Sequence, residues 1–170
     1  MNGVLSTLVA VLGTILGVVV THLFQRTSSE RAQNFALGQQ LRAERLTVYS
    51  DFAGAVTELR RGQQDRWHRR REDPESSHHF EARTESYRLR GVALHALFRV
   101  QLIADSPEVV DAARDAYEKT SALHQADDQQ GLRANGELAR ERLEQFIVLA
   151  STDLGVSPDA RPTLSGGSAR

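Results

Sequence analysis

The chain has 170 residues, with 21 Lys and Arg against 22 Asp and Glu, a formal net charge of -1 and no cysteine. This length supports one modest domain, and the balanced charge excludes a generally basic nucleic-acid binder. Without cysteine there can be no disulfide scaffold, thiolate zinc site, iron–sulfur cluster or cysteine nucleophile. The order of apolar and charged residues along the chain therefore indicates location and architecture, and it indicates no reaction and no named partner.

The strongest signal lies in residues 1–25, where no side chain is formally charged. As a helix, the apolar run 4–24 would span about 31 Å, close to the thickness of a bilayer's hydrocarbon core, about 30 Å. A cleaved signal peptide would need a positive n-region and a small-x-small cleavage site, and the sequence has neither. A buried core helix is the remaining alternative. We therefore expect a retained, single-pass transmembrane helix over residues 1–25.

The arginines that follow this segment predict its orientation. Nothing basic precedes it except the terminal amine, whereas Arg26 and Arg31 come directly after it. Basic flanks remain on the cytoplasmic side of a membrane. We expect the N-terminus outside the cell membrane and the C-terminal body in the cytoplasm.

Small residues recur along one face of this segment at spacings of three and four. They are Ser6, Ala10, Gly13, Gly17 and Thr21. Such a face lets two helix backbones approach closely in lipid. It predicts a homo-oligomer through the transmembrane helix or docking onto another membrane helix, although this spacing of glycines also arises by chance.

The rest of the chain has helical periodicity, with apolar residues at steps of three and four and no β alternation. We expect an all-α fold: an N-terminal transmembrane helix followed by an antiparallel four-helix bundle with a protruding helical-hairpin tip. The predicted regions are the span 1–25, a polar helical stalk 26–41, the cytoplasmic bundle 42–153 with its tip 60–85, and a tail 154–170. The tail is rich in Pro, Gly and Ser, which is typical of disorder.

Two polar-proline pairs predict where helices begin. Asp73-Pro74 and Ser106-Pro107 each place a good N-cap residue before a proline suited to the first helical position. A last helix is expected at about residues 129–152.

The helix expected at about residues 74–104 is apolar nearly all round in its second half, which is typical of a central, buried helix. His95 would then be buried on it. The two last helices are shorter, so we expect them to cover only the membrane-proximal part of the preceding hairpin. At the tip, Trp67 and Phe80 would then pack against each other.

The tip has an excess of arginine. Residues 60–73 contain six arginines and three acidic residues. Guanidinium groups beside an aromatic ring can bind phosphates or acidic protein surfaces. The predicted partner-binding residues are Arg66, Trp67, Arg69, Arg70 and Arg71. A solvated tip with no partner is the alternative, and specific nucleic-acid binding is disfavoured.

No set of residues predicts catalysis or a cofactor. Asp65/His68 and Glu75/His78 have the carboxylate-x-x-His spacing of some metal sites, but they lie on an expected surface without further core carboxylates. No nucleophile turn or Ser–His–Asp arrangement appears. We therefore expect a protein that is not an enzyme, with no metal, no cofactor and no catalytic residue.

Three strings carry a resemblance to a known type of protein: DRWHRRREDPES, YRLR and FRVQLIADSPE. With them, the chain resembles uncharacterised single-span membrane proteins of actinobacteria across most of residues 1–150. The resemblance implies an N-terminal anchor leading into arginine-rich helices. It implies no activity.

Together these observations predict a membrane-anchored, non-enzymatic interaction or scaffold protein. Its cytoplasmic bundle would bind an unidentified protein partner, while its span contacts membrane lipid. Two alternatives remain open: a signal-relay subunit of a membrane complex, and a membrane-permeabilising effector.

Overall fold

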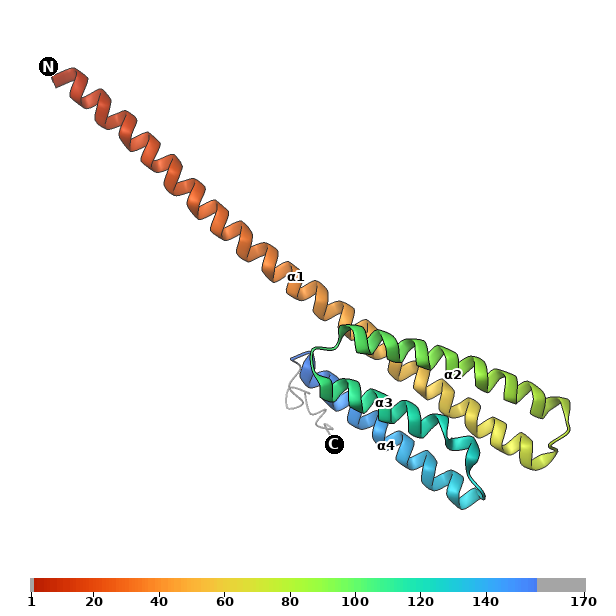
Figure 1. Ribbon diagram of the computed structural model, residues 1–170. Coiled ribbons are helices and arrows are strands. Elements are labelled where there is room, and N and C mark those ends of the chain that lie inside the picture. The colour runs from red at the N-terminus through yellow and green to blue at the C-terminus, as the bar shows by residue number, and fades with distance from the viewer. Residues whose placement is uncertain (1, 156–170) are drawn as a thin grey trace, which may run out of the picture. The chain divides into compact units, whose positions relative to one another are not determined.

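The computed structural model describes residues 2–155, and it describes side chains from residue 35 onward. Within that part of the chain every regular element is a helix (Figure 1). The elements are α1 (Asn2–Glu72), α2 (Ser77–Ile103), α3 (Pro107–Ser121), the short 3₁₀ helix η1 (Leu123–Gln125) and α4 (Gln129–Asp153). The all-α prediction is confirmed for these residues.

The chain divides into two compact units, and α1 contributes to both. The first unit ends at Ala43 and the second begins at Glu44. In the first unit, the described side chains are exposed, including Phe35 and Leu37 at 70% and 58%. The predicted transmembrane helix 1–25, with its small-residue face, lies outside the residues whose side chains are described. Among the described residues, no helix has both the length and the apolar character needed to cross a membrane.

The second unit is a helical bundle with an apolar core. In Figure 1, α2 lies beside the C-terminal part of α1, and α3 lies beside α4. Phe52 of α1 and Phe146 of α4 are both fully buried, and their rings meet edge to face with centroids 4.8 Å apart. Large aromatic pairs of this kind contribute strongly to core stability. Around them pack apolar residues of all four helices: Val48, Val56, Leu59, Leu97, Val100, Val109, Ala113 and Ala150.

The second half of α2 is not the most buried part of the bundle, contrary to expectation. Leu102, Phe98 and Val92 are 87%, 50% and 46% exposed, and His95 is exposed as well. Its buried face is made mainly of small residues: Ala82, Ser86, Ala93 and Ala96, with Leu97 and Val100 near its end. The helix packs on its neighbours through this face, while Val92, Phe98 and Leu102 remain largely exposed.

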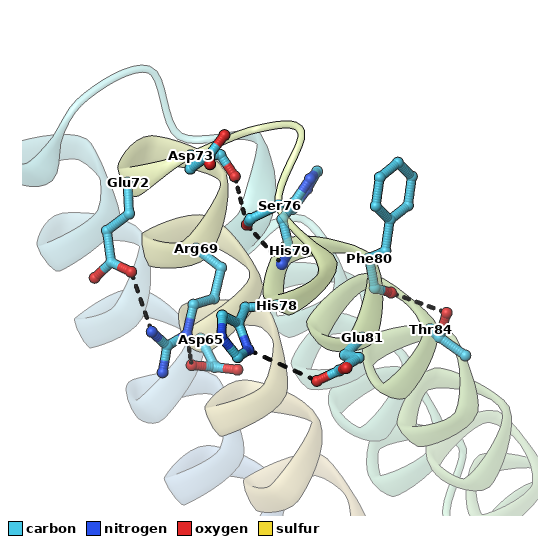
Figure 2. A network of polar contacts seen from close by, with 10 residues as sticks. All are labelled: Asp65, Arg69, Glu72, Asp73, Ser76, His78, His79, Phe80, Glu81 and Thr84. Carbon is cyan, nitrogen blue, oxygen red and sulfur yellow. Dashed lines mark hydrogen bonds and ion pairs between the residues drawn. The ribbon is translucent and has the colours of Figure 1, made fainter.

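The predicted start of α2 was wrong by three residues, whereas that of α3 is confirmed. Ser76 is the N-cap of α2, since its hydroxyl accepts a hydrogen bond from His79 N at 3.2 Å (Figure 2). Asp73 instead accepts a hydrogen bond from Glu75 N at 3.1 Å and shapes the turn. The α3 helix begins at Pro107, directly after its N-cap Ser106.

The predicted disordered tail begins too early by at least one residue. Leu154 is only 9% exposed and belongs to the core cluster. Gly155 follows with a φ of 66°, a left-handed conformation typical of the glycine that ends a helix. Residues 156–170 lie outside the described part of the chain.

Candidate partner-binding site

Trp67 connects the tip of α1 to the connection between α3 and α4. It is 6% exposed, and its indole Nε1 donates a hydrogen bond to Ala126 O at 2.7 Å. Phe80 is 51% exposed and points away from the neighbouring helix (Figure 2). The expected Trp67–Phe80 contact is therefore wrong, because the α3–α4 connection reaches further along the hairpin than helix lengths alone suggested. The α3–α4 connection covers the α1–α2 hairpin as far as Trp67. The predicted protruding tip is therefore shorter than expected and consists of the residues between Trp67 and the start of α2.

A pocket of about 330 Å³ opens beside this contact. We call it the tip pocket. Its lining residues are Trp67, Arg70 and Arg71 of α1, with Gln125, Ala126 and Asp127 of the α3–α4 connection. The pocket thus combines an aromatic ring, two guanidinium groups and backbone carbonyl groups at one end of the bundle.

The two arginines of the tip pocket differ in how they are held. Arg71 lies over the Trp67 ring, with its guanidinium carbon 5.1 Å from the ring centroid, and donates a hydrogen bond to Asp127 O. Arg70 is exposed and has no ion pair or hydrogen bond among the described residues. Arg71 is therefore part of the pocket's structure, whereas the charge of Arg70 is free to meet a ligand.

Arg66 and Arg69 lie outside the pocket, although the sequence grouped them with it. Arg69 forms ion pairs along its own helix, with Asp65 at 3.5 Å and Glu72 at 3.1 Å (Figure 2). Arg66 lies over the Tyr87 ring at 5.2 Å. The structure thus brings together three of the five predicted tip residues and adds residues of the α3–α4 connection, which no sequence motif marked.

A buried polar layer lies below the tip pocket. Gln63 is 1% exposed and donates a hydrogen bond from Nε2 to Ser121 O at 3.3 Å. The side-chain oxygens of Gln63, Thr120 and Ser121 are buried without a hydrogen-bond partner. Such groups cost about 1–3 kcal/mol each when left unpaired, so this end of the bundle is packed less favourably than the apolar end.

His124 adjoins this layer and faces several arginines. Its Nδ1 lies 3.0 Å from Ser121 O. Burial lowers the pKa of His124, and the nearby positive charges of Arg66, Arg90 and Arg70 lower this pKa further, while the Ser121 carbonyl opposes them. The neutral imidazole is therefore favoured in the folded protein.

The other tip histidines are near the surface and dispersed. His78 Nδ1 lies 3.8 Å from a carboxylate oxygen of Glu81 (Figure 2). His79 Nδ1 lies 2.6 Å from Pro74 O. Asp65 pairs with Arg69. In the part of the chain with described side chains, no group of three or more His, Asp or Glu is placed to hold a metal ion.

The bundle and its tip coincide with a known family. Residues 46–154 match the family described as KilB plasmid transfer protein. The chain belongs to this family. The match begins in α1 and ends at the last buried residue after α4, so it includes the tip pocket and all four bundle helices. No curated protein and no solved structure matches the chain.

Proposed function

We propose that this KilB-family chain is a non-enzymatic, membrane-anchored component of plasmid transfer that binds a protein partner through its tip pocket. The observation that carries the proposal is the family match over the whole bundle, together with the unpaired Arg70 in a pocket built at its end. The partner would present a carboxylate or a similar anion, because a free guanidinium recognises such groups in planar geometry.

The anchoring part of this proposal is supported by the sequence of residues 1–25. These residues contain no charged side chain and are followed by arginines. An anchor there would hold the bundle at the cytoplasmic face of the membrane. The role would be to place a binding surface at that face, where other components of a transfer apparatus could assemble.

Plasmid transfer frequency tests the binding role. Donor cells carrying Arg70→Glu should transfer the plasmid at least tenfold less often than wild type, because reversing the unpaired positive charge of Arg70 would repel an anionic partner. Arg114→Glu on α3 is the matched control, since Arg114 is also exposed and pairs only weakly with Asp111 along its own helix. The protein levels of both variants would be compared by immunoblot.

Equal transfer by Arg70→Glu and wild type at equal protein level would exclude the tip pocket as a required site.

The anchor is tested separately by fractionation. Full-length protein should remain with the membranes after washing with high salt and enter solution only with detergent. Recovery of the intact chain in the soluble fraction would exclude the anchor.

A further inference from the structure

Three arginines beside the buried polar layer have no carboxylate partner. They are Arg66 of α1 with Arg83 and Arg90 of α2, and none of them forms an ion pair with a described residue. We call them the lateral arginine cluster. A nearby arginine of α2 differs, because Arg88 pairs with Glu85 at 2.6 Å. The positive charge of the cluster is therefore not neutralised by the described part of the molecule.

Tyr87 lies between two members of the lateral arginine cluster. The guanidinium carbons of Arg66 and Arg83 lie 5.2 and 5.8 Å from the centroid of its ring. Arg66 also donates a hydrogen bond from Nη1 to Ser86 Oγ at 3.4 Å, so its side chain extends from α1 to α2. Two positive charges from different helices therefore converge on one ring.

Arg90 extends the cluster toward α3. Its Nε donates a hydrogen bond to the hydroxyl group of Tyr117 at 3.4 Å. Arg90 follows Ser86 by four residues, which is about one turn, so it lies on the same face of α2 as the residue that Arg66 contacts. Three guanidinium groups thus gather where α1, α2 and α3 come together.

Two titratable rings on different helices are affected by this charge. Hydrogen bonding by Arg83, together with the charges of Arg83 and Arg66, lowers the pKa of Tyr87. Burial lowers the pKa of His124 on η1, and the charges of Arg66 and Arg90 lower it further. Both shifts have the direction expected beside positive charge that no carboxylate neutralises.

The number of converging guanidinium groups indicates the chemistry of a ligand. Guanidinium groups bind carboxylates and phosphates through paired hydrogen bonds. A carboxylate has one negative charge, and so does each phosphodiester group of a nucleic acid. A terminal phosphate group has a charge of about −1.5 to −2 at pH 7 and three acceptor oxygens. Three guanidinium groups gathered at one place therefore fit a terminal phosphate group best.

We propose that the lateral arginine cluster binds the terminal phosphate group of a small phosphorylated compound. Arg66, Arg83 and Arg90 would donate hydrogen bonds to its oxygen atoms and neutralise its charge. The site goes beyond the proposed function, because it adds a small-molecule ligand and none of its three arginines lines the tip pocket.

Calorimetric titration of the full-length protein, in detergent solution, with inorganic pyrophosphate tests the site. Wild type should bind saturably, and Arg83→Gln/Arg90→Gln should bind about tenfold more weakly or less, because charge-assisted hydrogen bonds are lost. The matched control is Arg88→Gln/Arg114→Gln. It removes the same charge from two exposed arginines that pair along their own helices, and it should bind like wild type. Melting temperatures would show that both variants fold.

A second variant keeps the test decisive if Arg83→Gln/Arg90→Gln does not fold. Arg66→Lys retains the positive charge but loses the planar guanidinium group, so it should also weaken the binding of pyrophosphate. Adenosine diphosphate, which has the same terminal group, would be titrated in parallel. Binding tighter than that of pyrophosphate would support a nucleotide as the source of the phosphate, and equal binding would support a free phosphate compound.

Four outcomes would overturn the proposal. The first is no saturable binding of pyrophosphate by wild type, and the second is unchanged binding by folded Arg83→Gln/Arg90→Gln. Equal weakening in the control variant would mean attraction by net charge alone. Tighter binding of acetate, or of a single-stranded oligonucleotide without terminal phosphate, would mean that the cluster recognises a different anion. These titrations leave Arg70 unchanged and measure neither plasmid transfer nor membrane anchoring, so failure of this site is distinguishable from failure of the proposed function.

Discussion

The two ends of the bundle are built on different principles. At the end that contains Phe52 and Phe146, the interior is apolar and its aromatic rings interlock. At the tip, the interior contains Gln63, Thr120 and Ser121 with unpaired polar atoms. The two ends therefore contribute differently to the protein. The apolar end stabilises the packing of the four helices. The polar end has a less favourable interior, and above it lies the tip pocket with the unpaired Arg70.

The largest expected effect tests the apolar end. Phe52→Ala removes a fully buried ring and its contact with Phe146, which should lower the free energy of unfolding by about 3–5 kcal/mol. This is a large fraction of the stability of a small domain, about 5–15 kcal/mol. Chemical denaturation followed by circular dichroism measures it. A loss below about 1 kcal/mol would show that the aromatic pair does not stabilise the bundle.

A matched pair of substitutions compares the two ends directly. Val56→Thr puts a hydroxyl group into the apolar end and should destabilise the protein by about 1–3 kcal/mol, since Val56 is 1% exposed. Gln63→Leu removes a buried amide whose Oε1 has no partner, and should change stability by less than about 1 kcal/mol or increase it. If Gln63→Leu were as destabilising as Val56→Thr, the buried polar groups near Gln63 would be well hydrogen-bonded. The proposed difference in packing between the two ends would then be wrong.

Helix content and two of the helix starts could be predicted from the sequence, because both depend on local chemistry. Ser106-Pro107 and the start of α4 at Gln129 are examples, since capping residues act within one turn. The environment of α2 could not be predicted. Its apolar residues are consistent with burial or with exposure, and only the packing of α1 and α3 shows that Phe98 and Leu102 remain largely exposed.

The sequence predicted the arginine-rich composition of the tip, but it did not predict which residues the tip side chains contact. The excess of arginine along α1 is visible in the sequence, and Trp67, Arg70 and Arg71 do line a pocket. Arg69 forms ion pairs within its own helix because Asp65 is four residues before it and Glu72 is three residues after it. The contribution of Ala126 and Asp127 depends on how far the α3–α4 connection extends along α1, about 60 residues away in sequence.

The smallest expected effect is a pH dependence that belongs to the polar end. Because burial and three arginines lower the pKa of His124 in the fold, the unfolded chain binds more protons below about pH 6.5, the ordinary histidine value. The stability contributed by the neutral ring is present above that pH and is lost as pH falls from there toward the lowered pKa.

Thermal unfolding at pH 7.5 and 5.5 measures this dependence. His124→Gln should flatten the difference in melting temperature between the two pH values, whereas His95→Gln, on the exposed face of α2, should leave the wild-type difference in place. The effect is expected to be small because His124 is only half-buried and solvent screens the arginines around it. An unchanged pH dependence in His124→Gln would show that neither burial nor the nearby arginines lower the pKa of this ring enough to affect stability.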